Sequence, residues 1–166
     1  MHVLVGALGR VYKSAPLTQR PAAGAYALRS VTANSWAEDV VASARRGHPV
    51  LVLVYSSLCV GSEQCGSAHE ALSVALRRLA QSPPSGQVLP VLAFELDLVA
   101  NDLPDYRFSA PDLHLHPTLY WLAAGDAIEK QGAGPMRYEG AHDADSIELY
   151  VRSHVSSLPD LNKSEL

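Results

Sequence analysis

The stretch VLVLVYSSLCVGSEQCGSAHEAL, residues 50–72, determines how the rest of the chain is interpreted. It opens with a continuous apolar run of strand length, which is typical of a central strand covered on both faces. It ends where alanine and leucine begin to recur at helical spacing, so a helix is predicted from near Cys65 to a point before Pro83. Both cysteines of the chain, Cys59 and Cys65, lie between the strand and the helix, with five residues separating them.

The sequence before this stretch predicts one strand and one helix. AYALRSV, residues 25–31, has the composition of a short strand. Ser35 is the expected N-cap of the helix, because Glu38 follows it at the spacing of a capping box. Gly47 and Pro49 are expected to end this helix.

The sequence after the stretch alternates strands, turns and a last helix. The expected elements are a strand over 88–96 with Pro90 at its start, a polar connection over 101–110 with one helical turn, strands over 117–123 and 135–140, and an amphipathic helix from Ile147 to Val155 capped by Asp143 or Asp145. The first half implies parallel strand pairing, and the hairpin near the end implies antiparallel pairing. We therefore expect an α/β fold, with a central mixed β-sheet flanked by helices on both faces.

Length and charge limit the functional classes. The 166 residues suggest one domain, and the formal charge of −4 argues against binding to a nucleic-acid backbone. No apolar run reaches the roughly 18–20 residues of a membrane helix. Two cysteines are too few for a disulfide scaffold. We expect an N-terminal arm or extra strand over 1–25, the domain over 26–157 and a C-terminal tail over 158–166.

The two ends of the sequence bear on localisation. The first residues include a short apolar stretch without a basic region before it, which makes a poor signal peptide; a removed signal or a domain cut from a longer chain would look the same. Residues 163–166 spell KSEL, which differs at one position from the endoplasmic-reticulum retrieval signal KDEL. A chance polar tail is the alternative interpretation.

Taken in order, these segments resemble the thioredoxin superfamily, and within it the protein disulfide isomerase branch, from about Tyr26 to Val155. In that family a buried strand ends in an aromatic residue, and a Cys-x-x-Cys motif then opens a long helix. VLVLVYSSLC matches the strand and the first cysteine, and Cys65 with AHEALSVALRRLA matches the second cysteine and its helix. VLAFELD matches the next strand, HPTLYWLAAGD the cis-proline loop and its strand, and MRYEGAHDADSIELYVRSHV the last strand and helix. The resemblance implies a thioredoxin-like fold and makes Pro117 the candidate cis residue.

The chain differs from the family pattern at four places. Five residues separate the cysteines instead of two. Leu58 stands where a tryptophan usually precedes the first cysteine, and Gly66 where a basic residue often follows the second. Leu53 occupies the strand position where many members carry a buried acid.

The resemblance implies thiol–disulfide exchange on protein substrates, with Cys59 and Cys65 as the catalytic residues. A helix N-terminus stabilises a thiolate, and either cysteine is a candidate for the attacking group. The VGSEQ loop, which contains Gly61, is long enough to let the two cysteines pair, and closing so short a loop stabilises by only about 2 kcal/mol. By the same resemblance, the peptide edge at His116, before Pro117, binds the extended substrate chain.

Three other interpretations stay open. The chain could be a non-catalytic thioredoxin-like module that binds unfolded or partner proteins and uses its disulfide only as a staple. The cysteines could be two unrelated free thiols. Cys59, Cys65 and His69, with His114 or His116, could also hold a zinc ion, although their spacing matches no standard zinc finger. We predict no cofactor and no metal site.

The expected partners follow from the exchange reaction and the tail. They are unfolded or client proteins, redox partner proteins and, through KSEL, an endoplasmic-reticulum retrieval receptor, with no nucleic acid and no membrane among them. The expected localisation is the lumen of the endoplasmic reticulum.

Overall fold

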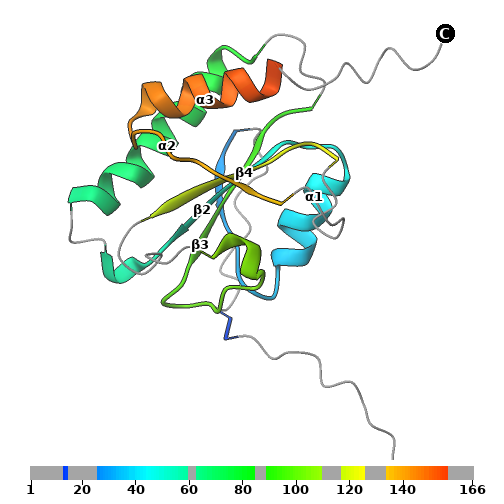
Figure 1. The fold of residues 1–166 in the computed structure, drawn as a ribbon, viewed down its shortest axis with the longest axis vertical. Coiled ribbons are helices and arrows are strands. Elements are labelled where there is room, and N and C mark those ends of the chain that lie inside the picture. The colour runs from blue at the N-terminus through cyan, green and yellow to red at the C-terminus, as the bar shows by residue number, and fades with distance from the viewer. Residues whose placement is uncertain are drawn as a thin grey trace, which may run out of the picture.

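The structure is a computed structural model that describes residues 13–14, 26–59, 63–84, 89–109, 117–125 and 134–156. It contains a five-stranded sheet with helices on both faces (Figure 1). In chain order the elements are β1 (Leu28–Ser30), the π-helix η1 (Ala37–Val41), α1 (Ala42–Arg45), β2 (Val50–Tyr55), the 3-10 turn η2 (Ser57–Cys59), α2 (Glu63–Gln81), β3 (Leu92–Asp97), the 3-10 turn η3 (Tyr106–Phe108), β4 (Thr118–Leu122), β5 (Met136–Arg137) and α3 (Ala144–Ser156).

The sheet combines parallel and antiparallel pairing. The strand order is β1-β3-β2-β4-β5. The first three strands of this order run parallel, whereas β4 is antiparallel to β2 and β5 is antiparallel to β4. The predicted α/β class and mixed sheet are therefore confirmed. The central position of β2 explains its apolar run, because both of its edges and both of its faces are covered.

Successive residues of β2 alternate between two apolar layers. One layer lies between the sheet and the helices α2 and α3, and the other lies on the face covered by α1 (Figure 1). The first layer includes Leu51, Leu53, Leu72, Leu76, Trp121, Ile147 and Val151. The second includes Trp36, Val40, Val50, Val52, Val54, Phe94, Phe108 and Tyr120.

The start of the first helix differs from the prediction. Thr32 Oγ1 accepts a hydrogen bond from the backbone N–H of Ser35 at 3.2 Å, and Ser35 Oγ accepts one from the N–H of Thr32 at 3.1 Å. The reciprocal pair of a capping box is thus Thr32 with Ser35, and the prediction of Ser35 with Glu38 is wrong. Both hydroxyl side chains are buried and need partners, whereas Glu38 is exposed.

The other helix ends agree with the sequence. Gly47 follows α1 with φ +89°, and its N–H donates to the carbonyl of Ala44 at 3.0 Å. At the start of α3, Asp143 accepts hydrogen bonds from both the backbone N–H and the hydroxyl of Ser146, each at 2.8 Å. These bonds hold the pKa of Asp143 below its ordinary value. Of the two expected caps, Asp143 is therefore the one that caps the helix, and Asp145 forms an ion pair with Arg78 of α2.

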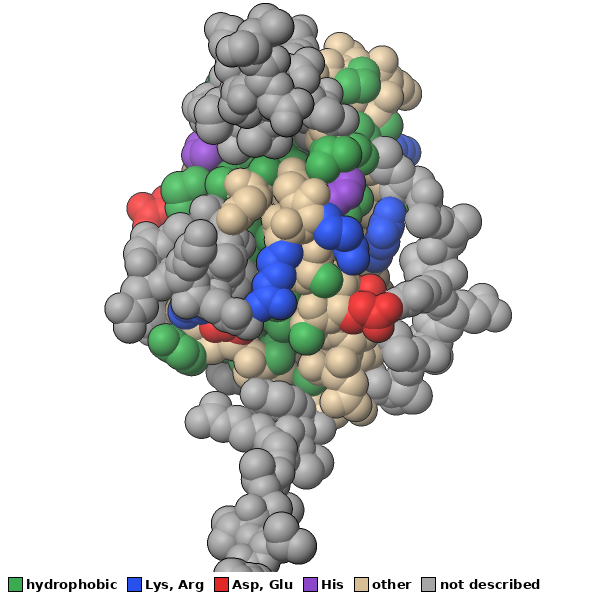
Figure 2. All heavy atoms as spheres, turned by 90° about the vertical axis from the view of Figure 1, so that its right-hand side faces the viewer, with side chains coloured by type: hydrophobic (Ala, Val, Ile, Leu, Met, Phe, Trp, Pro, Cys, Tyr) green, Lys and Arg blue, Asp and Glu red, His purple; other side chains and the backbone are tan. Residues whose placement is uncertain are grey.

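The surface on the α1 side carries both signs of charge. Figure 2 shows Lys and Arg side chains interspersed with acidic and apolar ones on this face. None of the helices that the structure describes combines the length and the apolar character needed to cross a membrane.

Candidate functional site

The carboxyl ends of β1, β3 and β2 meet at one edge of the sheet, because the three strands are parallel. Tyr55, the last residue of β2, pairs with Asp97, the last residue of β3. Directly after Tyr55 the chain enters the turn η2, which ends at Cys59. This edge therefore holds the first of the predicted catalytic cysteines.

Asp97 holds the cysteine turn against the sheet. Its Oδ1 atom accepts hydrogen bonds from the backbone N–H of Ser57 at 2.9 Å and from that of Val99 at 3.0 Å. Within the turn, the N–H of Cys59 donates to the carbonyl of buried Ser56 at 2.9 Å. One carboxylate thus ties together the chain segments that leave β2 and β3, and it sets the position of Cys59.

Cys59 is half-buried and disulfide-bonded. The sequence contains one other cysteine, Cys65, which is the third residue of α2. No described cysteine is a free thiol, so the interpretation of two unrelated free thiols loses its support. The bond joins the loop after the central strand to the beginning of the longest helix, α2, which has 19 residues.

Leu58 is the most exposed large apolar side chain of the site. It precedes Cys59 in the turn and is 84% exposed. Exposed leucines are common on protein surfaces, but this one directly precedes a disulfide-bonded cysteine in the chain.

Pro117 lies at the same edge of the sheet. Thr118 at the start of β4 pairs with Val54, so buried Pro117 is placed beside the end of β2, where the cysteine turn begins. His114 and His116 lie outside the described residues, and with them the isomer of the His116–Pro117 bond. Within the described residues there is no cis peptide bond. The structure thus brings Pro117 beside the end of β2, and the role of His116 stays a prediction.

His69 on α2 contacts a carboxylate that the sequence interpretation did not single out. Its Nε2 atom lies 2.8 Å from Oε2 of Glu95 on β3. Ser30 Oγ of β1 donates to the other carboxylate oxygen, Oε1, at 2.6 Å. Glu95 pairs in register with Leu53, the position where the family pattern has its acid. An acidic residue inside the apolar segment VLAFELD was the available signal for Glu95.

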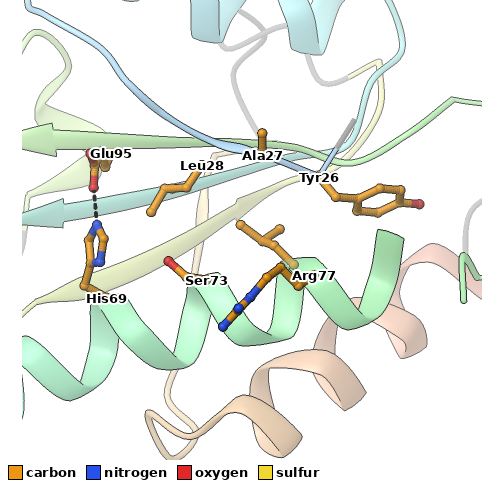
Figure 3. A pocket seen from close by; sticks show the side chains of 8 residues that line it. Tyr26, Ala27, Leu28, His69, Ser73, Arg77 and Glu95 are labelled. Atoms are coloured by element: carbon orange, nitrogen blue, oxygen red, sulfur yellow. Dashed lines mark hydrogen bonds and ion pairs between the residues drawn. The ribbon is translucent and has the colours of Figure 1, made fainter. Parts of the chain in front are cut away.

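A pocket of about 320 Å³ lies between α2 and the strand β1 with the residues before it (Figure 3). His69 and Glu95 face each other at one end of it, and Arg77 and Tyr26 lie toward the other end. Leu28, Ser73 and Leu76 also line the pocket. The His69–Glu95 pair is therefore open to solvent through this pocket.

The charges at this edge also act on Tyr55. Burial, together with the nearby carboxylates of Glu95 and Asp97, raises the pKa of its phenol to about 12. At neutral pH Tyr55 is therefore neutral, and the acidic groups of β3 carry the charge of the site.

The structure offers no support for the zinc alternative. Cys59 is in a disulfide and His69 contacts Glu95. Among the residues that the structure describes, no three His, Cys, Asp or Glu side chains are grouped to hold a metal ion.

Comparisons with known proteins do not assign the chain. No protein-family model matches the sequence, and no curated protein is significantly similar to it.

Proposed function

We propose that this chain is a thioredoxin-like domain of the protein disulfide isomerase type, which exchanges disulfides with protein substrates through Cys59 and Cys65. The observation that carries the proposal is the disulfide-bonded Cys59 in the turn between the central strand β2 and the helix α2. Disulfides at exposed turns between elements are more open to exchange than buried ones.

The arrangement of the whole sheet supports the proposed fold. Three parallel strands are followed by an antiparallel hairpin, and β2 lies at the centre of the whole sheet; this agrees with the order of elements that the sequence resemblance implies. Pro117 at the start of β4 has the position expected for the residue that follows the substrate-binding peptide edge. The proposed substrate edge at His116 would then lie next to the cysteine turn.

The proposed reaction uses the disulfide as an electron acceptor. A substrate thiolate attacks one sulfur of the pair, which forms a mixed disulfide, and the other sulfur leaves as a thiolate with the bonding electrons. A second substrate thiolate then attacks the mixed disulfide, so the substrate becomes oxidised and both cysteines become reduced. The N-terminal turn of α2 contains position 65, and the partial positive charge of a helix N-terminus stabilises a thiolate there.

The proposed location and partners rest on this fold together with the KSEL tail. We place the protein in the lumen of the endoplasmic reticulum, where disulfides persist. Its partners would be unfolded or client proteins, redox partner proteins and a retrieval receptor for the tail.

A second candidate function is a non-catalytic module that binds unfolded or partner proteins, with the disulfide as a structural staple. The exposed Leu58 favours it, since an apolar side chain beside Cys59 suits binding without requiring chemistry. The absence of an acid at Leu53 points the same way.

Two measurements separate these functions. In an insulin-reduction or refolding assay, Cys59→Ala and Cys65→Ala should each abolish activity; full activity in both variants would rule out exchange. In a redox titration, a potential between about −270 and −120 mV supports exchange, whereas a bond that resists reduction below about −300 mV supports the staple.

A further inference from the structure

Among the described strands, β1 lies at an outer edge of the sheet and has β3 as its neighbour on the inner side. Directly after β1, the N–H of Val31 donates to the carbonyl of Glu95 at 2.9 Å, so Val31 and Arg29 direct their backbone groups toward β3. Leu28 and Ser30 alternate with them and direct their N–H and C=O groups to the outer edge, where no described residue bonds to these groups. Such unpaired groups can bind another extended chain.

A stripe of polar side chains on α2 runs beside this edge. It consists of His69, Ser73 and Arg77, which are spaced four residues apart and all line the pocket between α2 and β1 (Figure 3). Residues four apart on a helix are separated by about 6 Å along its axis, and alternate residues of a strand by about 6.6 Å. A strand that adds to β1 would therefore bring its successive α2-facing side chains next to successive members of the stripe.

The stripe runs along β1 and not across it. At one end, His69 contacts Glu95, which is the register partner of Ser30, the last residue of β1. At the other end, Arg77 lies toward Tyr26, which precedes β1 in the chain. The pocket thus follows the direction that an added strand would take.

The two ends of the pocket differ in charge. Both carboxylate oxygens of Glu95 are engaged, Oε2 by His69 at 2.8 Å and Oε1 by the hydroxyl of Ser30 at 2.6 Å. Arg77 is exposed, and none of the described residues forms an ion pair or a hydrogen bond with its guanidinium. The end of the pocket at Arg77 is therefore complementary to an acidic side chain.

We propose that the outer edge of β1 and the stripe on α2 bind an extended segment of a partner protein, which adds to the sheet as a strand and carries an acidic residue opposite Arg77. The backbone of this segment pairs with Leu28 and Ser30. The α2-facing side chain that follows the acidic one is apolar, because it meets Leu28 and Leu76 in the pocket. In strand addition the main-chain hydrogen bonds provide affinity, and pockets for alternate side chains provide specificity. This surface is separated from β2 and the cysteine turn by β3, and it does not depend on the proposed exchange function.

Charge complementarity is tested with labelled, capped peptides of valine and threonine that carry either one central glutamate or one central lysine. In fluorescence anisotropy, the wild type should bind the glutamate peptide about three- to fivefold more tightly, because a single exposed ion pair contributes little. Arg77→Glu should reverse this preference. Arg137→Glu on β5, at the opposite edge of the sheet, is the matched control and should keep it. An unchanged preference in Arg77→Glu, or no binding of either peptide, would overturn the inference.

Strand addition is tested by N-methylation of the glutamate peptide at alternate residues. One set of methyl groups removes the N–H groups that pair with β1 and should weaken binding about tenfold or more, because those hydrogen bonds are lost. The other set lies on the outer side of the added strand and should leave the affinity within about twofold of the parent peptide. Equal affinities of the two methylated peptides would overturn the inference.

Two further measurements exclude other surfaces and other occupants. Leu58→Ser alters the cysteine turn and should leave the affinity for the glutamate peptide unchanged; a loss would place the peptide at that turn and overturn the inference. Analytical ultracentrifugation should show the same oligomeric state for the wild type and for Arg77→Glu. A dimer that Arg77→Glu disrupts would assign the edge to a second copy of the chain, and would also overturn it. The insulin assay tests the exchange function alone, so failure there leaves this inference standing.

Discussion

Asp97 is the residue on which the shape of the cysteine turn depends. Its carboxylate satisfies two backbone N–H groups, those of Ser57 and Val99. Asp97→Ala should lower the free energy of unfolding by about 1–2 kcal/mol, because these donors lose their partner. Urea denaturation measures the change. Glu139→Ala is the control, is exposed, and should stay within about 0.5 kcal/mol of the wild type. An equal loss in both variants would contradict this role of Asp97.

A substitution at Leu58 can test substrate binding without a large effect on the stability of the fold. It is 84% exposed, so Leu58→Ser should change the free energy of unfolding by less than about 0.5 kcal/mol. If Leu58 contacts substrates, exchange with a protein substrate should fall several-fold, while exchange with a small disulfide is unchanged. Leu149 on α3 is 70% exposed and provides the control, since Leu149→Ser should alter neither reaction. Identical protein-exchange rates for wild type and Leu58→Ser would remove Leu58 from the substrate-binding surface.

Tyr55 makes the fold sensitive to alkaline pH. In the folded protein its pKa is raised to about 12 from an ordinary value of 10.0, chiefly by burial and also by Glu95 and Asp97. The unfolded chain therefore loses this proton first, and the stability present below pH 10 declines between about pH 10 and 12. Tyr55→Phe should flatten this decline in denaturation curves recorded across that range. Tyr106→Phe, at an 83% exposed position, should leave the decline as it is; equal slopes in all three proteins would contradict the assignment.

At the scale of elements, replacing two glycines by alanine should change the stability of the protein in opposite directions. Gly47 has φ +89° after α1, so Gly47→Ala should destabilise by about 1 kcal/mol through backbone strain. A Cβ there would meet Leu89 at an ordinary 3.5 Å, so crowding is not the cause. Gly66 lies in α2 with nothing near its missing Cβ, and Gly66→Ala should stabilise by about 0.5–1 kcal/mol. Thermal denaturation should give a lower melting temperature for Gly47→Ala and a higher one for Gly66→Ala. Melting temperatures that shift in the same direction would contradict this prediction.

The elements themselves were predictable because their signals are local. The apolar run of β2, the leucine spacing of α2 and the cap at Asp143 each appear within a few residues of sequence. The Thr32–Ser35 capping box was missed because Thr32 with Ser35 and Ser35 with Glu38 have the same three-residue spacing. The structure uses the pair whose side chains are both buried. The His69–Glu95 contact was missed for a different reason: its partners are 26 residues apart and meet only when α2 packs on β3.

At the scale of the whole molecule, the mixed pairing of the sheet followed from the alternation of strands and helices, whereas the full order of the strands was not predicted. Continuous apolar character predicted that β2 would be central, and a short hairpin predicted antiparallel pairing at the end of the chain. The position of Cys59 at the edge of the sheet follows from the same order. Reactivity does not follow from it, because it depends on charges such as those of Glu95 and Asp97 on β3, which contact α2 and the cysteine turn only in the folded chain.

The chain consists of two segments that are held together by the pairing of β2 with β4. Residues 28–97 supply the parallel strands with α1 and α2, and residues 118–156 supply the hairpin with α3. The segments meet along five paired positions of β2 and β4, through Arg78 with Asp145, and through Arg152, which donates to the carbonyl of Ser82 at 2.8 Å. Two polypeptides that end and begin between residues 109 and 117 should therefore reassemble when mixed. Their dissociation constant would measure the free energy with which the hairpin segment binds to the central strand β2 and to α2.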